Sequence, residues 1–475
     1  MIRTQTVIVV LIFTYATAFA QVAPVSADRP WHGSELQQLE VDARRFRESR
    51  FSVEPNKVYS LPELIDLAEA HHPDTRIAWE AARARLADLG VARSELYPTL
   101  AAIALARINR AQVLFGADFY RQTIDTFQGT LDLSYTIVDF GARSGRIAAA
   151  RAQLLAANLA FNDTHRKLIN QVQQAYYRLL NASGQEEAAR ANLVNAQTAQ
   201  QAAEDRLKNG LATLPDVLEA RSATAQAEYD LQTVLGAQEI ARGDLATALG
   251  TAATVSIRVQ SLDQLPIPES ITDTVEQAID RALQNRPDLM QQLAEVRSAN
   301  ARVREARAAY YPTLNFNATP TPQFLYGWQQ TLPSTHTGGL NGGLTLNLNW
   351  SIFDGGARKN RLAQADAESR KEEAQVSAAR NQITDEIWTA YSNLRTALRQ
   401  RQSATALLEA ATQSYAAALE SYKYGVRSFL DVTAAQRTLA QARSTDVAAR
   451  TQVLSAVATL AYQTGDALQS AGRRP

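Results

Sequence analysis

The chain has 475 residues, with 48 Lys and Arg balanced by 48 Asp and Glu, so it carries no basic excess that would favour binding to nucleic acid. It contains no cysteine, which excludes disulfide bonds, thiolate metal sites and a lipid-modified cysteine at a mature N-terminus. Aromatic residues make up only 7%, and Ala, Gln, Arg, Leu and Glu dominate, a composition that suits long helices better than a compact enzyme core.

The first 20 residues have the pattern of a secretory signal peptide: a basic Arg3, an apolar run from Val7, and Ala18-Phe19-Ala20 before Gln21. A retained membrane anchor is the alternative, but about 14 weakly apolar residues are short for a span of ~20. We predict cleavage after residue 20, followed by a polar and largely extended N-terminal arm over residues 21–58. No later segment has the apolar length of a transmembrane helix, so further membrane contact is expected from strands.

Residues 59–250 predict a first repeat that begins with a helix. Ser60 and Glu63 have the spacing of a capping box, and the helix that they open is interrupted near the HHPD sequence at 71–74. It resumes to about Leu96, where a Tyr-Pro-Thr-Leu turn ends it.

A β-hairpin is predicted over about 99–139, with a second strand that alternates cleanly and a first strand that alternates poorly. A helical run follows to about Asn209, and its apolar residues recur with coiled-coil spacing. Some 66 residues at ~1.5 Å each give a rod of roughly 100 Å. Gly210 ends the rod, and a returning helix begins near Pro215, so a tip turn is expected over about 206–216.

Two matching stretches, LDLSYTIVDFGARSGR at 131–146 and LNLNWSIFDGGARKNR at 346–361, each join alternating residues to a helical run. The alternation predicts strands with one apolar and one polar side. The shared Asp-x-Gly-Ala-Arg sequence predicts a structural junction between strand and helix. Its expected residues are Asp139, Gly141, Arg143, Asp354, Gly356 and Arg358.

After an irregular connector at 251–272, the whole pattern returns over 273–465, followed by a C-terminal tail at 466–475. Pro73 matches Pro287, 214 positions later, and Asp139 matches Asp354, 215 positions later, so the halves differ by one residue in the hairpin. The second hairpin is expected over about 313–354 and the second tip turn over about 421–431. A register kept over both halves is a strong sign of duplication.

Alternating strands of about ten residues in a secreted chain predict a membrane β-barrel. Two hairpins supply only four strands, whereas small barrels need about eight, so strands that span a membrane require oligomerisation. The alternative is a soluble four-stranded sheet attached to coiled coils. Aromatic residues near both ends of the hairpins predict the two girdles of a barrel, with core packing as the competing interpretation: Phe119, Tyr120, Phe324, Tyr326, Trp328, Tyr97, Tyr311 and Trp350.

The order of these elements, the paired YPTL turns, the Asp-x-Gly-Ala-Arg junctions and the YxxGxR turn at 422–427 resemble the TolC-type outer-membrane efflux protein family over about 59–465. The resemblance implies a mainly α fold with a membrane β part: a homotrimer with a 12-stranded β-barrel continued by a 12-helix α-barrel. It places the protein in the outer membrane of a Gram-negative bacterium, extending into the periplasm. A periplasmic adaptor and an inner-membrane pump are the implied partners. Pro320 and Pro322 put the length of the third strand in question, because proline cannot donate to a sheet.

The resemblance also assigns roles at the tips. Tyr422 and Arg427 match the latch that holds the tunnel mouth shut, Asp216 matches their partner in the first turn, and Asp431 matches a constriction carboxylate. Ala434 stands where some members have a second carboxylate. Thr213 with Asp216 and Ser428 with Asp431 also have capping-box form, so both carboxylates have a structural interpretation as well.

Catalytic interpretations are weak. Asp139-Phe140-Gly141 lacks the other kinase motifs, and His71-His72 lacks a zinc-binding frame. Gly338-Gly339 and Gly342-Gly343 precede a strand, which favours a flexible loop over a phosphate cradle. We expect no catalytic residue, no metal and no cofactor. The expected function is a passive exit duct of a tripartite efflux or type I secretion system with an iris-like periplasmic gate. The alternative is a trimeric coiled-coil adhesin or structural fibre, and a hydrolase would require an acid/base pair that the sequence does not show.

Overall fold

The computed structural model describes residues 39, 41–43, 54, 57–271, 273–330 and 332–466. The predicted signal peptide, most of the predicted arm and nearly all of the C-terminal tail lie outside this set. Two compact units divide at Val53 and Glu54, and the architecture below is that of the second unit. Among the described residues, no helix combines the length and apolar character needed to cross a membrane.

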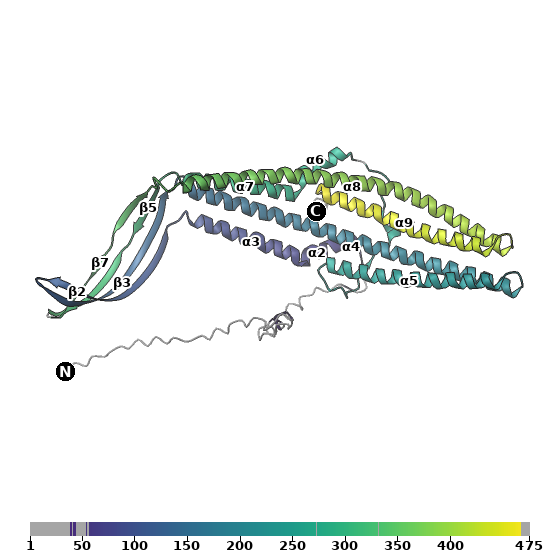
Figure 1. Ribbon diagram of the computed structural model, residues 1–475, viewed down its shortest axis with the longest axis horizontal. Coiled ribbons are helices and arrows are strands. Elements are labelled where there is room, and N and C mark those ends of the chain that lie inside the picture. The colour runs from purple at the N-terminus through teal and green to yellow at the C-terminus, as the bar shows by residue number, and fades with distance from the viewer. Residues whose placement is uncertain are drawn as a thin grey trace, which may run out of the picture. The chain divides into compact units, whose positions relative to one another are not determined.

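The first half of this unit contains two helices, one long hairpin and two further helices in chain order, and the hairpin extends from one end of the helices (Figure 1). A capping box at Ser60 and Glu63 begins the first helix, as predicted, and His72 separates it from the second. The elements are α2 (Leu61–His71), α3 (Pro73–Ser94), β2 (Thr99–Phe115), β3 (Asp118–Val138), α4 (Ala142–Lys208) and α5 (Leu214–Ala248).

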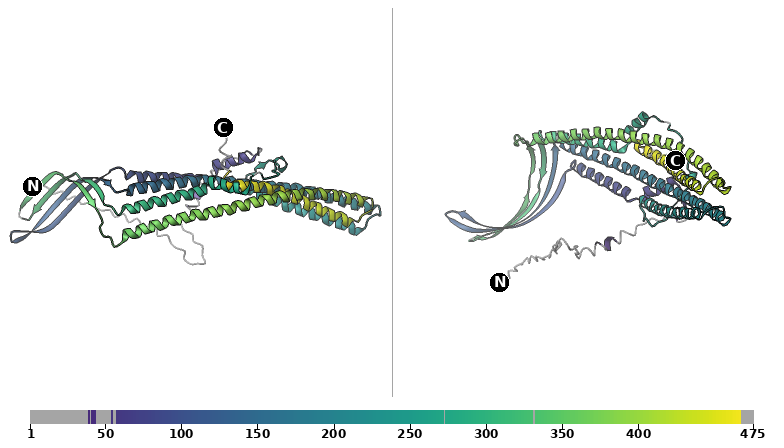
Figure 2. Two further views of the ribbon diagram at one scale, coloured as in Figure 1. Left: turned by 90° about the horizontal axis from the view of Figure 1, so that it is seen from above. Right: turned by 45° about the vertical axis from the view of Figure 1, so that its right-hand side comes forward.

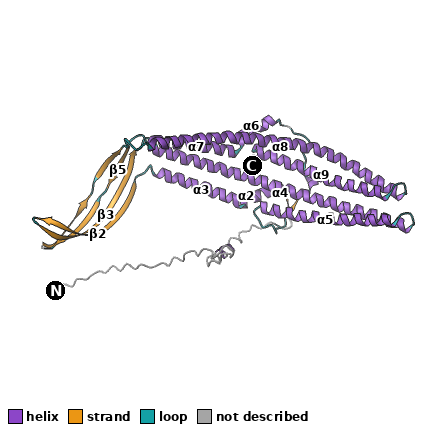
Figure 3. Ribbon diagram, in the orientation of Figure 1, coloured by secondary structure: helices purple, strands orange, loops and turns teal. Residues whose placement is uncertain are grey.

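The second half repeats this order, with both strands of its hairpin interrupted (Figure 3). Its elements are α6 (Val275–Asn285), α7 (Pro287–Ala308), β5 (Thr313–Ala318), β6 (Thr321–Gln329), β7 (Leu332–Asn341), β8 (Leu344–Asn349), α8 (Ala357–Lys423) and α9 (Phe429–Thr464). Between the halves, β4 (Arg258–Val259) pairs in parallel with β1 (Val58–Tyr59), and a short 3₁₀ helix, η1, covers Leu262–Gln264.

The two hairpins form one antiparallel sheet. β2 pairs with β3, β3 pairs with both β5 and β6, and these two segments pair with β8 and β7 respectively. The prolines interrupt the third strand at one point only, between Ala318 and Thr321, and Pro322 lies inside β6. The flexible loop expected at Gly338-Gly339 is wrong, because both residues lie in β7. Gly338 faces a ring there, since an added Cβ would lie 2.8 Å from the ring of Phe324.

Residue pairing gives this sheet two distinct faces. Tyr135 lies opposite Phe316, which lies opposite Leu346, and the same face continues to Leu100 and Leu133. We call this side the apolar face. The opposite side, the polar face, carries Thr and Asn, and Thr136 donates a hydrogen bond of 2.9 Å to Asn315 across two strands. The predicted alternation is therefore realised in three-dimensional pairing.

The helices follow the same lateral order as the strands, and the long helices lie side by side in the views of Figures 1 and 2. Next to the sheet, α4 packs between α3 and α7, and α7 packs against α8. Towards the tips, α4 packs between α5 and α9, and α9 packs against α8. Each level is thus an array of four neighbouring helices, and α4 and α8 run through both levels.

Small residues allow these helices to approach closely. Alanine forms much of the buried apolar surface, including Ala175, Ala203 and Ala418. An added Cβ at Gly145 of α4 would lie 2.9 Å from the backbone nitrogen of Glu305 in α7. Dispersion attraction between closely packed backbones therefore stabilises this array, as contacts between large side chains stabilise a globular core.

A charged cluster crosses the array where α7 begins and α9 ends. Arg166 is only 1% exposed, and it contacts Asp163 at 2.7 Å, Asp288 at 3.2 Å and the carbonyl oxygen of Tyr462 at 3.0 Å. Burial alone would raise the pKa of Asp288, but hydrogen bonds from Arg286 and the charges of both arginines lower it. These buried ions are paired, as burial requires.

We predict that Gly145→Ala lowers the free energy of unfolding by about 1–3 kcal/mol, because the added methyl group forces the backbones of α4 and α7 apart. Chemical denaturation of the purified protein measures this change. Gly236→Ala in α5 is the matched control, since a Cβ there meets no atom within 4 Å. It should be neutral or stabilising by up to about 1 kcal/mol. Equal effects of the two substitutions would contradict the close-approach argument.

Candidate functional site at the helix tips

The strand-to-helix junction after β3 is held by Asp139 and Arg143. Asp139 accepts hydrogen bonds from the backbone nitrogen of Arg143 at 2.7 Å and from its Nε at 2.9 Å. Arg143 also donates to the carbonyl oxygens of Glu95 and Ile137. Burial would raise the pKa of Asp139, but the bonds from Arg143 and Gly141 hold it below its ordinary value. These partners belong to the junction and to the C-terminal end of α3.

The second junction repeats this geometry. Asp354 accepts from the backbone nitrogen of Arg358 at 2.9 Å and from its Nε at 3.0 Å. Gly141 and Gly356 both precede their helices with positive φ, 100° and 87°, which explains the glycine in each copy. These six residues therefore cap helices and close a turn, as a structural junction does.

At the opposite ends of the long helices, two turns connect α4 to α5 and α8 to α9. Gly210 and Gly425 take positive φ values of 73° and 77° after the last helical turn. The nitrogen of Leu211 donates to the carbonyl oxygen of Arg206 at 2.8 Å, and Val426 donates to Ser421 at 2.9 Å. This hydrogen-bond pattern terminates each helix, and glycine alone accepts the backbone angles without strain.

Both tip carboxylates cap the helix that follows the turn. Oδ2 of Asp216 accepts from the backbone nitrogen of Thr213 at 2.9 Å and from its hydroxyl at 2.8 Å. Oδ2 of Asp431 accepts in the same way from Ser428, at 3.2 and 2.9 Å. In each case the second carboxylate oxygen takes no part in these two bonds. A capping carboxylate therefore keeps one oxygen for another cation.

Of the three predicted latch residues, Tyr422 and Asp216 lie close enough within one chain to interact electrostatically. Tyr422 is 4% exposed and packs edge-to-face on Phe429, with ring centroids 5.3 Å apart. Burial raises the pKa of Tyr422, and the charge of Asp216 raises it further. Arg427 is exposed, and its side chain makes no hydrogen bond or ion pair within the described part of the chain. The second turn thus presents an exposed guanidinium, whereas its tyrosine is buried.

Arg206 at the end of α4 joins the two turns, and sequence reasoning missed it. Its Nη1 donates to the carbonyl oxygen of Lys423 at 2.9 Å and its Nη2 to that of Leu211 at 3.0 Å. The guanidinium also lies over the ring of Tyr422, 4.9 Å from its centroid. In the sequence, an arginine at a polar helix end cannot be distinguished from a charge that only contacts water. The available signal for Arg206 was its position four residues before the turn glycine, Gly210.

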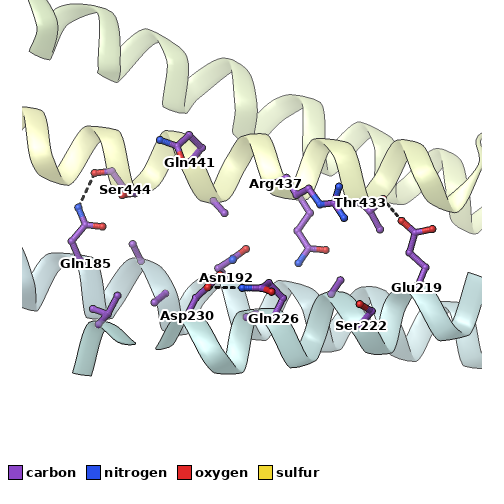
Figure 4. Close-up of a pocket in the computed structure, with 17 residues that line it drawn as sticks. Gln185, Asn192, Glu219, Ser222, Gln226, Asp230, Thr433, Arg437, Gln441 and Ser444 are labelled. Carbon is purple, nitrogen blue, oxygen red and sulfur yellow. Dashed lines mark hydrogen bonds between the residues drawn. The ribbon is translucent and has the colours of Figure 1, made fainter. Parts of the chain in front are cut away.

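A groove of about 630 Å³ lies above the tips between α4, α5 and α9 (Figure 4). Its walls carry polar side chains, among them Gln226, which donates to Asp230 at 2.8 Å. Gln185 donates to the carbonyl oxygen of Ser444 at 2.9 Å across it. Glu219 accepts a 3.4 Å bond from Thr433 and so faces this groove rather than the tip turns.

The remaining candidates have structural roles. The ring Nδ1 of His72 accepts from the backbone nitrogen of Asp74 at 3.2 Å and caps α3. Within the described ranges, no group of three His, Cys, Asp or Glu side chains is arranged to hold a metal ion. Asp139-Phe140-Gly141 is the junction described above.

An amphipathic sheet, continuous with a layer of long helices that ends in two tip turns, defines the class of outer-membrane channels that reach into the periplasm. The family model for outer membrane efflux proteins matches residues 64–251 and 278–466, and the chain belongs to this family. It is 30% identical to protein CyaE of Bordetella pertussis over 415 residues, covering 86% of this chain and 84% of that protein.

One further relative and two solved structures agree. Outer membrane protein OprJ of Pseudomonas aeruginosa is 26% identical over 390 residues, which cover 80% of this chain and 78% of OprJ. Among solved structures, the outer-membrane channel OprN superposes with a TM-score of 0.75 at 21% identity, covering 87% of this chain and 93% of OprN. CusC gives a TM-score of 0.72 at 20% identity, with 88% and 96% covered. The predicted fold class is thereby confirmed.

The protein is therefore an outer-membrane efflux component that extends into the periplasm. The resemblance stated from the sequence is confirmed, and the adhesin or fibre alternative is disfavoured. The family consists of channels rather than enzymes.

We predict that Arg206→Ala loosens both tip turns, because it removes two hydrogen bonds and a cation–π contact at once. Limited proteolysis should then cut at residues 209–213 or 424–428 at least several-fold faster than in the wild type. Lys208→Ala is the control, since that side chain is 71% exposed and its one ion pair among the described residues is a 3.4 Å contact with Asp205. Unchanged cleavage in Arg206→Ala would mean that the turns hold their conformation without the clamp.

Proposed function

We propose that three copies of this chain form one closed exit duct. Each chain contributes a four-stranded sheet whose outer strands, β2 on one side and β7 with β8 on the other, pair on one side only. Unpaired strand edges are costly in lipid, and pairing each edge with the next copy satisfies them. Three copies give twelve strands, and the matching four-helix arrays give twelve helices at each level.

The faces of the sheet fit this assembly. The apolar face turns to lipid, and the polar face of Thr and Asn lines a water-filled interior. Large apolar side chains on the apolar face are exposed in the single chain, including Leu346 at 65% and Leu348 at 65%. Exposure on this scale favours lipid contact over the core packing that was the competing interpretation of the sheet's apolar residues.

The duct is passive, because neither the family nor the described site supplies a group that couples to an energy source. The names of relatives include components of antibiotic and toluene efflux pumps. By analogy, this protein receives its cargo from an inner-membrane pump through a periplasmic adaptor that meets the helix tips. It serves a tripartite efflux or type I secretion system.

The tips form the gate. Asp216 uses one oxygen to cap α5, and the other is available to Arg427 of a neighbouring copy. Arg427 is exposed and Asp216 half-buried, which suits a bond made and broken at the surface. Tyr422 packs beneath the turn and sets its position. Asp431, repeated three times around the mouth, supplies the constriction charge.

The assembly is tested by the mass and conductance of protein purified from the outer-membrane fraction. A trimer that conducts in planar bilayers supports the duct. A monomer without conductance would overturn it, and a surface-displayed trimer without conductance would favour the adhesin.

We predict that Arg427→Ala and Asp216→Asn each raise the conductance of the trimer by loosening contacts between copies. Asparagine retains a carbonyl that accepts the capping bonds, so Asp216→Asn separates the latch from the cap. Arg221→Ala serves as control, because Arg221 already pairs with Glu204 of its own chain at 3.1 Å. Single-channel recordings that show wild-type conductance in both latch variants would remove these residues from the gate.

We predict that Asp431→Asn reduces the cation preference of the channel, because rings of carboxylates favour cations. Reversal potentials in a salt gradient measure the change, and the substitution leaves the capping geometry intact. Asp205→Asn, which neutralises an exposed carboxylate on α4, should leave the reversal potential at its wild-type value. A reversal potential that does not move in Asp431→Asn would place this carboxylate outside the conduction path.

A further inference from the structure

The apolar face of the sheet changes character along β3 in a regular order. Leu131, Leu133, Tyr135 and Ile137 occupy the part near the junction, and Phe127 follows towards the hairpin turn. From Phe127 to Ile137 the strand advances about 33 Å, which at a tilt of about 45° spans about 23 Å of membrane thickness. This agrees with the apolar band of about 25 Å that outer-membrane barrels carry.

An aromatic row marks the outer limit of this band. Phe127 lies opposite Phe324, and the next row places Tyr326 between Asp125 and His336. Phe127 and Tyr326 meet edge-to-face with ring centroids 6.3 Å apart, and Tyr326 stacks on His336 at 6.0 Å. Aromatic rings with polar tips are typical of the boundary between lipid tails and headgroups.

Basic residues lie in the next two rows outward, the first of which also carries Trp328 opposite Thr123. Arg110 lies opposite Thr123, and Arg121 lies opposite Gln112. Arg110 and Arg121 are therefore diagonal neighbours on the apolar face, and such positions lie about 7–8 Å apart. Both side chains are exposed, and the Nε of Arg110 donates to Thr123 at 3.3 Å, which directs its guanidinium along the face.

The Thr123 row lies four residues beyond Phe127, or about 9 Å along the membrane normal by the same geometry. That depth belongs to headgroups and not to lipid tails. The junctions and helices lie at the periplasmic end of the strands, so the hairpin turns face the outer leaflet. On the same face, Asp125 lies one row closer to the junctions than Arg110, and Arg121 lies one row closer to the hairpin turn. An anion therefore fits between Arg110 and Arg121, away from the Asp125 carboxylate.

We propose that Arg110 and Arg121 bind a phosphate group of the phosphorylated glycolipid in the outer leaflet. The inference rests on the proposed function, because it requires the apolar face to contact lipid. Two guanidinium groups at this spacing flank one phosphate, with charge-assisted hydrogen bonds from each side. His336, two strands away on the same face, stacks on Tyr326 and extends the polar border.

The test compares Arg110→Gln/Arg121→Gln with Arg107→Gln, each as the full-length trimer in detergent. Arg107 lies on the same strand as Arg110 but on the polar face, opposite Thr126, so it is a matched control. The probes are a diphosphorylated lipid A, the same lipid without its phosphates, and inorganic phosphate. Native mass spectrometry measures lipid retention, and thermal unfolding measures stabilisation.

The wild type and Arg107→Gln should bind the diphosphorylated lipid equally, and the double variant should bind it at least about tenfold more weakly, as loss of one or more charge-assisted bonds predicts. Removing the phosphates from the lipid should abolish that difference. If the double variant fails to assemble, Arg121→Gln alone replaces it, because the Arg121 side chain makes no bond in the described part of the chain that its loss would break.

Equal binding by the double variant, or equal loss in Arg107→Gln, would overturn the assignment. Stabilisation by inorganic phosphate that matches the lipid would also overturn it, since the site would then take a free anion. Conductance is recorded on the same preparations. Conducting trimers without lipid selectivity would refute only the phosphate site, whereas a wild type that neither assembles nor conducts would refute the duct itself.

Discussion

The constraint on which this structure depends is the backbone of an amphipathic sheet with two open edges. A sheet with one apolar face and one polar face fits a boundary between lipid and water, but only if every strand finds partners on both sides. Two hairpins in one chain leave two edges. Under the proposed function, duplication of the hairpin and assembly of copies together supply the strands that enclose water. The helices have the same lateral order as the strands, because α3 leads into β2, β3 into α4, α7 into β5 and β8 into α8.

Duplication also explains why the two tips are related but not equivalent. Asp216 and Asp431 occupy matching positions 215 residues apart and make the same capping bonds. Arg206 matches Ser421 at that offset, and Arg427 matches Ala212. The capping function is therefore shared, whereas the clamp and the exposed guanidinium each occur in one half. The first turn reaches across to the second through Arg206, and the second turn presents its own charge outward. The two turns therefore share their capping bonds but differ in the charged side chains that they carry.

Sequence reasoning worked where a repeating pattern has one physical meaning. Period-two alternation fixed the faces of β3 and β8, and glycine with Ser or Thr capping boxes marked the ends of the long helices. It failed where a local pattern has several outcomes. Gly338 and Gly339 predicted a loop, because sequence does not show that Phe324 covers the strand on which they lie. Arg206 was missed since its partners are carbonyl oxygens from two distant turns, and backbone acceptors leave no trace in sequence. The charged cluster at Arg166 is hidden for a similar reason, because two of its partners, Asp288 and the carbonyl oxygen of Tyr462, come from helices more than a hundred residues away.

The equal length of α4 and α8, at 67 residues each, constrains how this protein can change over time. Both helices begin at the same kind of junction and end at the same kind of turn, so their tips come level without any further adjustment. An insertion of one heptad into a single hairpin would move one tip by about 10 Å relative to the other. Gene lineages should therefore tolerate substitutions along these helices far more readily than insertions or deletions, and a change in length should survive only when both repeats acquire it.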